Sequence, residues 1–422
     1  MVNEENNAIE VCTSSAAKTV TAEFIWEAAF TSGYPVAIWR LPESDRLRLI
    51  VSENLLPGRV VPDLEKLESG FLLAPFSSSA ESTVLFLEGS LILSFPVGQP
   101  AAEVPAEELD DEDFRSVLFK KAIALQETAA ERALPDNTII AKEADGAEER
   151  FRRIVQLGAE AVRAGELFKV VLSRRREFDY SPGFSFISAF LQLEAAYASA
   201  FVSMVSLPHL QEVWLGASPE LLVGISRRRY FKTVALAGTQ SATDAAGAVK
   251  PRFKVLWSEK EIEEQAIVSR YIIECFKKIR LREYVETGPK SSKAGNLYHL
   301  KSDFEVDLEA VNFPELGSVM LKLLHPTSAV CGMPREEARA LIDSLEGYDR
   351  SLYSGYWGPV NVGDETCLFV NLRTLRAKNG IMTLFAGAGI TADSDPGEEW
   401  NETELKCDTL LRVIAPGAAL KQ

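Results

Sequence analysis

The residues best suited to chemistry lie near the end of the sequence, in residues 384–411. An apolar run there predicts a buried strand, which leads into a turn of small residues at 386–389. Asp395, followed by proline, then marks the start of a helix, because a capping side chain before a first-turn proline is typical of one. Glu402 and Lys406 stand four residues apart in that helix and share one face. An anion-accepting turn, a carboxylate and an ammonium group together would suit a substrate with carboxylates and a metal ion.

Two simpler interpretations of this stretch compete. Residues 387–392 match the GxGxxA dinucleotide motif, but in that motif the helix begins inside the glycines so that its N-terminus meets the pyrophosphate. Here the capping residue comes later, at Ser394 or Asp395, which disfavours dinucleotide binding. Taken alone, Glu402 and Lys406 would by default be interpreted as an ordinary surface ion pair, a contact that contributes about 0.3–0.5 kcal/mol.

Charge and composition exclude several classes of protein. The 422 residues are 46% hydrophobic and 25% charged, as in soluble globular chains, and a net charge of −16 without a basic tract argues against nucleic acid as a partner. We find no signal-like segment and no apolar run that could span a membrane, so we expect a cytoplasmic protein without a membrane partner. The five cysteines lack CxxC spacing and the three histidines are scattered, which favours free thiols and, for any metal, a hard cation bound by carboxylates.

The rest of the chain predicts a mixture of strands and helices. Short apolar runs between turn residues predict antiparallel strands from residue 22 to about 100. An acidic, proline-punctuated stretch at 100–113 predicts a loop. Helical spacing then appears over residues 114–132, 147–164, 184–198 and 335–345. Because strands and helices do not alternate in a regular parallel repeat, the pattern favours an α+β fold.

A lysine lies among apolar residues in a predicted strand over residues 166–174. Strand alternation places Lys169 on the same side as Val171 and Ser173. Burial disfavours the charged form of lysine, so a buried Lys169 would need a functional reason. The spacing leaves the alternative equally open, a solvent-facing or edge position in which lysine blunts strand pairing.

A glutamate lies within the apolar face of a predicted helix. Ser258 and Glu261 form a capping box that opens a helix ending near residue 279. At about 100° per residue, Glu264 falls in an apolar face with Val268 and Ile272. A carboxylate in such a face is costly unless it is protonated, paired or bound to a metal. Glu264 is therefore the single residue that most strongly indicates a function.

Three more polar residues interrupt predicted strands. Glu220 follows a proline that breaks residues 213–226; a kink there would aim the carboxylate into a cavity, or Glu220 is simply a polar turn residue. Arg373 is an internal charge in one predicted strand over residues 366–377, where it would suit bidentate binding of a carboxylate, although an outward-facing arginine is commoner. His299 lies in the interior of another predicted strand.

A series of segments along residues 168–411 resembles the chorismate-utilising enzymes, the family of isochorismate synthase, salicylate synthase and the large subunit of anthranilate synthase. The segments are KVVLSR, GASPELL, ALAGT, SEKEIEEQAIV, LYHL, HPTSAVCGMP, LYSGYWGPV, LFVNLRT, FAGAGI and EWNETELK. The resemblance implies an α+β fold like that of anthranilate synthase component I, with antiparallel β-sheets packed as a sandwich-like core, helices outside and the active site in a cleft between the halves. It also implies one chorismate-binding domain over residues 1–422, with a strand-rich part over 1–113 and a core over 160–415.

By this resemblance each candidate residue gains an expected role. Glu264 and Glu402 match the ligands of Mg²⁺, which would neutralise the ring carboxylate of chorismate and favour departure of the ring hydroxyl. Arg373 and Lys406, with the backbone at Gly387 and Gly389, would hold the substrate carboxylates. The full set of expected substrate-binding residues is Gly238, Thr239, His299, Ala329, Val330, Arg373, Gly387, Gly389 and Lys406.

A few positions decide the expected reaction. Lys169 matches the lysine with which isochorismate and salicylate synthases deprotonate the attacking water, where ammonia-using relatives typically have glutamine. Glu220 matches the general acid that protonates the leaving hydroxyl. Ala329 and Val330 match the isochorismate synthases, whereas relatives that go on to eliminate pyruvate commonly have threonine at the first position. Gln265 departs from the pattern, since many relatives have histidine beside the metal-binding glutamate.

We therefore expect an Mg²⁺-dependent isochorismate synthase that acts as a monomer without a glutaminase subunit. Its product would serve menaquinone or siderophore synthesis. The alternatives are a salicylate synthase, an ammonia-using aminase and, from a different class, a catalytically silent chorismate-binding protein.

Overall fold

The computed structural model describes residues 17–416 apart from 79–81, 106–108, 110–111, 132–133, 143–145, 228, 243–248 and 295–296. Its helices are α1 (Ala22–Ser32), α2 (Phe114–Glu127), α3 (Ala147–Arg163), α4 (Phe186–Ala196), α5 (Glu259–Lys278), α6 (Leu316–Leu324), α7 (Arg335–Glu346) and α8 (Pro396–Ile414). The strands are β1 (Lys18–Thr21), β2 (Val36–Arg40), β3 (Arg46–Val51), β4 (Gly58–Val60), β5 (Gly70–Ala74), β6 (Val84–Glu88), β7 (Leu91–Pro96), β8 (Ala101–Val104), β9 (Ile139–Ala141), β10 (Lys169–Tyr180), β11 (Phe201–Leu207), β12 (Glu212–Ser218), β13 (Leu221–Ser226), β14 (Tyr230–Ser241), β15 (Val285–Ala294), β16 (Leu297–Asp307), β17 (Gly332–Met333), β18 (Tyr356–Val360), β19 (Glu365–Val370), β20 (Thr374–Lys378) and β21 (Ile381–Ile390).

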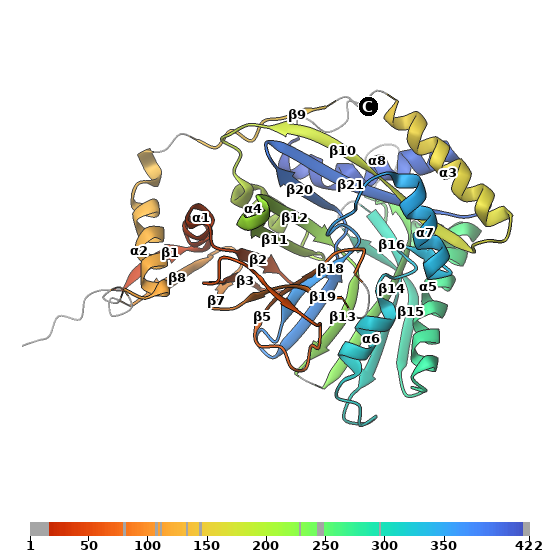
Figure 1. Ribbon diagram of the computed structural model, residues 1–422, viewed down its shortest axis with the longest axis horizontal. Coiled ribbons are helices and arrows are strands. Elements are labelled where there is room, and N and C mark those ends of the chain that lie inside the picture. Colours follow the sequence, from red (N-terminus) through yellow and green to blue (C-terminus); the bar gives the residue numbers. More distant parts are fainter. Residues whose placement is uncertain are drawn as a thin grey trace, which may run out of the picture.

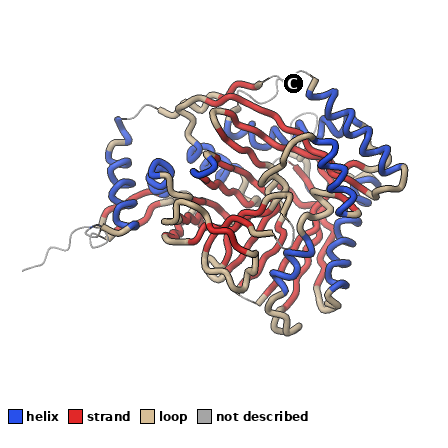
Figure 2. Tube along the Cα trace, viewed as in Figure 1, coloured by secondary structure: helices blue, strands red, loops and turns tan. Residues whose placement is uncertain are grey.

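Two large antiparallel sheets dominate the fold (Figures 1 and 2). Within the described residues, one sheet has ten strands in the order β17-β10-β21-β20-β12-β11-β2-β3-β7, with β9 paired to β10, and the other has nine in the order β15-β16-β14-β13-β19-β18-β5-β6-β4. A separate pair joins β1 to β8. Strand β2 pairs with β11 and β5 pairs with β18, so the N-terminal strands complete the same two sheets as the later ones.

The two large sheets pack face to face over an apolar core. Phe201 of the ten-stranded sheet stacks on Phe369 of the nine-stranded sheet, with ring centroids 4.3 Å apart. Trp39 contacts Phe71 across the same interface with tilted rings, whose centroids are 5.3 Å apart. All four rings are almost fully buried, and such aromatic pairs add to the free energy that their area alone contributes. This interface is the sandwich-like core that the resemblance implies.

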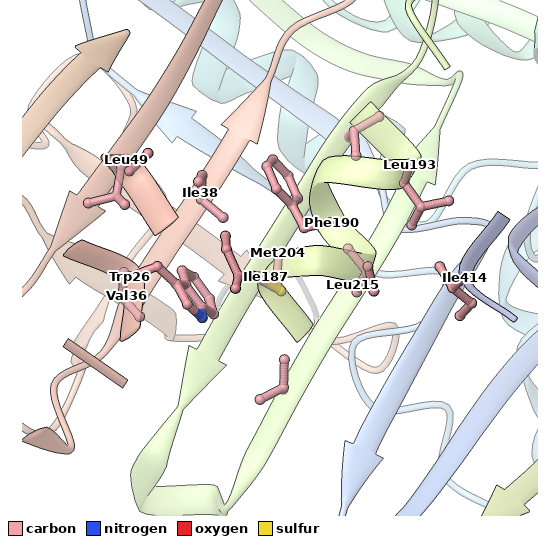
Figure 3. Close-up of a cluster of buried hydrophobic side chains, with 14 of the residues drawn as sticks. Trp26, Val36, Ile38, Leu49, Ile187, Phe190, Leu193, Met204, Leu215 and Ile414 are labelled. Atoms are coloured by element: carbon pink, nitrogen blue, oxygen red, sulfur yellow. The ribbon is translucent and has the colours of Figure 1, made fainter. Parts of the chain in front are cut away.

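Helices cover the outer faces of the sheets. On the ten-stranded sheet, Trp26 of α1, Phe190 of α4 and Ile414 of α8 belong to one buried cluster with Met204 and Leu215 of the strands beneath (Figure 3). Helices α5 and α6 cover the nine-stranded sheet, α5 beside β14 and β16 and α6 beside β13 (Figure 1). The predicted fold class, α+β with antiparallel sheets inside and helices outside, is confirmed.

The N-terminal part differs from the prediction at two places. Residues Ala22–Ser32, predicted to begin a run of strands, form α1, an alanine-rich helix that buries one face and ends at Gly33 in the left-handed conformation. The acidic stretch predicted as a loop includes strand β8, and Asp113 at its end caps α2 by accepting the N–H of Ser116 at 2.8 Å. Residues 106–108 and 110–111 of that stretch lie outside the described residues.

Two further observations concern the expectations from composition. Among the helices of the described residues, none is both long enough and apolar enough to cross a membrane. Cys275, Cys331, Cys367 and Cys407 are free thiols, as the spacing predicted, and Cys12 lies outside the described residues.

Candidate active site

A pocket lies between the two sheets. It is lined by residues of β10 and β21 from one sheet, of β14 and β16 from the other, and of helices α5 and α8. Lys169 does not itself line the pocket, but it donates a hydrogen bond to Glu264, which does. All the other residues expected from the sequence line the pocket: Glu220, Gly238, Thr239, Glu264, His299, Ala329, Val330, Arg373, Gly387, Gly389, Glu402 and Lys406.

Lys169 is buried, with 1% of its surface exposed, so the solvent-facing alternative is wrong. Its Nζ donates to Oε1 of Glu264 at 2.6 Å. The pairing of β10 with β21 places Gly389 beside this contact. A Cβ at Gly389 would lie 2.6 Å from that glutamate oxygen and 2.7 Å from Cε of Lys169. A side chain at this position would have to push both of these side-chain ends aside, so glycine leaves room for the ion pair.

Glu264 reaches the pocket from the first half of α5. Ser258 and Glu261 form the predicted capping box at the start of that helix. Burial opposes ionisation of Glu264, but the charge and hydrogen bond of Lys169, together with the charges of Lys406 and Lys260, outweigh it and lower the pKa of the carboxyl. Its Oε2 accepts the backbone N–H of Gly238 at 3.3 Å. Glu264 is thus an anion held between an ammonium group and a backbone amide.

Glu220 lies between β12 and β13, directly after the strand break that Pro219 predicted, and only 3% of its surface is exposed. The hydroxyl of Thr327 donates to its Oε1 at 3.4 Å. Burial raises the pKa of Glu220 to about 7, against the lowering effects of Thr327, Lys169 and Lys406. Near neutral pH this carboxyl can therefore hold a proton and release it, as a general acid must.

Arg373 is oriented by His299. A guanidinium can only donate and a carbonyl can only accept, so the contacts of His299 fix its tautomer: Nδ1–H donates to the carbonyl of Gly238 at 2.7 Å, and Nε2 accepts from Arg373. Burial and the charge of Arg373 lower the pKa of His299 well below its usual value, so the ring is neutral. Burial also lowers the pKa of Arg373 to about 10, and the group remains a cation at neutral pH.

The predicted strand around Arg373 is interrupted. The segment predicted as one strand over residues 366–377 forms β19 and β20 with a break between them, and Arg373 lies in the break with φ +46°. The left-handed conformation turns the chain there. Its carbonyl accepts the N–H of Ala217 of β12 at 3.0 Å. Sequence spacing did not show the break because apolar residues continue on both sides of it, as they would in a continuous strand.

The small-residue turn predicted at 386–389 is wrong. Strand β21 continues through Gly387 and Gly389 to Ile390, paired with β10. The carbonyl of Gly387 accepts a hydrogen bond from Nζ of Lys406 at 2.7 Å, and a Cβ on Gly387 would lie 3.0 Å from the hydroxyl of Tyr353. These glycines keep the pocket wall free of side chains. The helix cap predicted after the strand is confirmed, since Asp395 accepts N–H groups of the first turn of α8.

Helix α8 contributes two carboxylates to the same region. Glu402 pairs with Lys406 at 2.7 Å one turn later, as the spacing predicted. Burial opposes the charge of Lys406, but Glu402 raises its pKa, so Lys406 is a cation inside the pocket. Glu399, 1% exposed, accepts from Lys260 of α5 at 2.6 Å. Burial and repulsion from Glu402 raise the pKa of Glu399.

The donor atoms suit a hard divalent cation. Among the described residues no cluster of three or more histidine, cysteine, aspartate or glutamate side chains forms a complete metal cage. Glu264 and Glu402 nevertheless line the same pocket, each with one oxygen held by a lysine. Mg²⁺ is commonly held by one or two carboxylates while water and substrate oxygens complete its shell. The two glutamates fit that pattern.

Several pocket residues escaped the sequence analysis. Tyr353 and Leu372 come from loops, and Phe385 of β21 stacks on Tyr353 with centroids 5.1 Å apart. Leu236 and Pro219 complete the apolar part of the lining. Apolar and aromatic residues such as these are indistinguishable from core residues in a sequence. The only available signal was that they lie in the segments LYSGYWGPV, LFVNLRT, FAGAGI, ALAGT and GASPELL.

Gln265, the departure from the family pattern, points away from the pocket. Its Nε2 donates to the carbonyl of Ala235 and to Ser302 Oγ, both at 3.2 Å. It therefore anchors α5 on the nine-stranded sheet next to Glu264. His325 is also not among the pocket-lining residues and packs its ring edge-on against Tyr356.

Comparison with known proteins identifies the family of this chain. The family model described as chorismate binding enzyme matches residues 103–415. The isochorismate synthase EntC of Escherichia coli is 31% identical over 279 residues, which cover 65% of this chain and 70% of that protein. The isochorismate synthase DhbC of Bacillus subtilis is 29% identical over 274 residues, which cover 63% and 68%.

Solved structures share the fold over almost the whole chain. The menaquinone-specific isochorismate synthase MenF from Escherichia coli aligns with a TM-score of 0.68 and 20% identity, covering 95% of both chains. Anthranilate synthase component I from Streptococcus pneumoniae aligns with a TM-score of 0.63 and 18% identity, covering 97% of this chain and 95% of that one. The fold implied by the resemblance is thus confirmed, and with the family match over residues 103–415 the chain belongs to the chorismate-binding enzymes.

Proposed function

We propose that the protein is an isochorismate synthase, which converts chorismate to isochorismate with the help of Mg²⁺. The observation that carries the proposal is the pair of buried groups at one pocket, Lys169, the proposed base, and Glu220, the proposed acid, whose pKa is about 7. The named relatives EntC, DhbC and MenF are isochorismate synthases. MenF is named as menaquinone-specific and a relative in Vibrio cholerae as vibriobactin-specific, so we propose that the product serves menaquinone or siderophore synthesis.

In the proposed reaction one water enters and one leaves. Lys169 takes a proton from a water molecule as its oxygen bonds to carbon 2 of the ring. The ring double bonds shift, the bond between carbon 4 and its hydroxyl breaks, and that hydroxyl takes the proton of Glu220 and departs as water. Arg373 and Lys406 are the cations that would hold the two carboxylates of chorismate. Both lie in the pocket lining and remain charged at neutral pH.

Glu264 and Glu402 would hold the Mg²⁺ ion. The bound ion would supply positive charge to the ring carboxylate and so favour departure of the hydroxyl. In the structure Lys169 donates to Glu264, whereas a base must be free to accept a proton. The two roles are compatible when the carboxylate of Glu264 is shared with a cation, because its charge is then no longer directed at Lys169 alone.

We expect Glu264→Gln and Glu402→Gln each to weaken Mg²⁺ binding at least about 10-fold, because each removes one anionic ligand. Mg²⁺ titration by calorimetry measures this without turnover. Glu404→Gln is the matched control: Glu404 lies on the same helix but pairs with Arg174 and Arg176 and is not among the pocket-lining residues. Unchanged Mg²⁺ affinity in either pocket variant would remove that residue from the proposed metal site.

The proposed function is tested by incubating the purified protein with chorismate, with and without Mg²⁺, and identifying the products by chromatography and NMR. We expect isochorismate only with Mg²⁺ and no pyruvate, as Ala329 indicates. Stoichiometric pyruvate with salicylate would make the protein a salicylate synthase. An aminated ring in a parallel tube with ammonium salt would overturn the assignment of Lys169, and no consumption of chorismate would favour a silent binding protein.

A further inference from the structure

A buried ion pair lies behind the pocket and takes no part in lining it. Arg350 and Glu346 have side chains 2% and 1% exposed. The guanidinium of Arg350 donates two hydrogen bonds to the carboxylate of Glu346, from Nη2 to Oε1 at 2.5 Å and from Nε to Oε2 at 2.9 Å. The guanidinium also lies over the ring of Phe76 at 4.3 Å. The side chain of Arg350 is thus fixed in one orientation by its bidentate contact with Glu346 and by its stacking on Phe76.

The remaining donors of Arg350 hold the backbone of two pocket walls. Its Nη1 donates to the carbonyl of Val330 at 2.8 Å, and its Nη2 donates to the carbonyl of Val171 at 2.7 Å. Both valines line the pocket. One side chain therefore bridges strand β10 and the segment that contains Ala329 and Val330, next to the backbone bond in which the N–H of Val171 donates to the carbonyl of Cys331 at 2.8 Å.

Glu346 extends the same network along β10. Its Oε1 accepts the backbone N–H of Ser173 at 2.6 Å and the hydroxyl of Ser173 at 2.9 Å. In the sheet Val171 pairs with Gly389 and Ser173 with Gly387. The network thus binds β10 at Val171 and Ser173, starting two residues after Lys169. These two residues lie beside Gly389 and Gly387 of the pocket wall.

We propose that Arg350 and Glu346 are positioning residues, which hold the strand of Lys169 and the wall at Ala329 and Val330 at the separation the reaction requires. Neither side chain would touch the substrate. The inference rests on the proposed function, since it assigns to this pair the placement of the base relative to the wall that faces the ring. A displacement of about 1 Å in such a placement costs about 100-fold in rate.

Arg350→Lys is the sharpest test, because lysine keeps the charge but cannot make four directed bonds. We expect kcat to fall about 100-fold, with circular dichroism showing a folded protein at the assay temperature. Glu346→Gln, which keeps the size of the side chain, should act in the same direction. Arg40→Lys is the matched control, because Arg40 forms a similarly buried ion pair with Glu194 at 2.7 Å and is not among the pocket-lining residues. Its kcat should stay within threefold of the wild type.

Hydrogen exchange followed by mass spectrometry separates positioning from a general loss of stability. In Arg350→Lys, peptides covering residues 169–174 and 327–332 should exchange at least tenfold faster than in the wild type, whereas Arg40→Lys leaves them unchanged. Wild-type exchange in both peptides, with or without loss of turnover, would overturn the inference. An inactive wild type would instead refute the proposed function, and the exchange measurement would still decide whether the pair holds these segments.

Discussion

Replacing Glu220 by glutamine should lower kcat by about 10²–10⁴-fold, because the leaving hydroxyl loses its proton donor. In the wild type, kcat/KM should fall as the pH rises through about 7, where the free enzyme loses the proton of Glu220. The residual activity of Glu220→Gln should lack this decline, since an amide does not titrate. Rate measurements from pH 5.5 to 9 show both effects. Undiminished turnover in Glu220→Gln would remove Glu220 from the reaction.

The same substitution should stabilise the folded protein at alkaline pH. Burial raises the pKa of Glu220 from 4.5 to about 7 in the folded state, so the folded protein binds this proton more tightly than the unfolded chain. The stability from this group is complete below about pH 4.5 and is lost as the pH rises through about 7. At pH 8 the ionised carboxylate therefore lowers the free energy of unfolding by an amount on the order of 3 kcal/mol. Glutamine does not ionise and avoids this loss.

Urea unfolding at pH 5 and pH 8 measures this difference. The advantage of Glu220→Gln over the wild type should be small at pH 5 and large at pH 8. An equal difference at the two pH values would contradict the raised pKa. A variant that is less active and more stable would show that the buried acid is retained for chemistry at the expense of stability.

Replacing Lys169 by alanine should also lower kcat by about 10²–10⁴-fold, because the attacking water loses its base. Chorismate binding should persist, since Arg373 and Lys406, the proposed carboxylate contacts, are unchanged. Turnover and equilibrium binding of chorismate, measured on the same preparation, separate the two properties. Lys378→Ala is a suitable control, because it removes another lysine–glutamate pair, with Glu212 at 3.0 Å, that is not among the pocket-lining residues.

If Lys169→Ala keeps more than a tenth of the wild-type kcat, Lys169 is not the base. A second variant, Lys169→Gln, tests how close the water and ammonia reactions lie. We expect this variant to lose isochorismate formation. An aminated product formed with ammonium salt would show that the two reactions lie close together. These outcomes depend on the chemistry at Lys169 and not on the fold.

The parts of the site that follow from local sequence rules were predictable. The capping box of Ser258 fixes the start of α5, so the face on which Glu264 lies follows from helical periodicity. Asp395 and the proline after it fix the start of α8 in the same way, which places Glu402 and Lys406 on one face. Strand alternation gave the side of Lys169, but only the packed structure shows that this side is buried.

Features that depend on distant partners were not predictable. Gly387 and Gly389 have the composition of a turn, yet β10 pairs with them and keeps the strand straight. Arg373 interrupts a strand because its backbone bonds to β12, more than 150 residues earlier in the sequence. The helix at Ala22–Ser32 was missed because apolar residues on a helix packed against a sheet resemble those of a strand. At the two glycines and at Arg373, a long-range contact overrides the local pattern.

The most direct test of the central claim is to run the reaction in water labelled with oxygen-18 and to analyse the product by mass spectrometry at low conversion. If Lys169 activates solvent water against carbon 2 while Glu220 releases the hydroxyl of carbon 4, each isochorismate formed carries one oxygen-18 atom at carbon 2. Isochorismate without the label would mean that the hydroxyl migrates within the substrate. That result would contradict the acid and base roles assigned to this pocket.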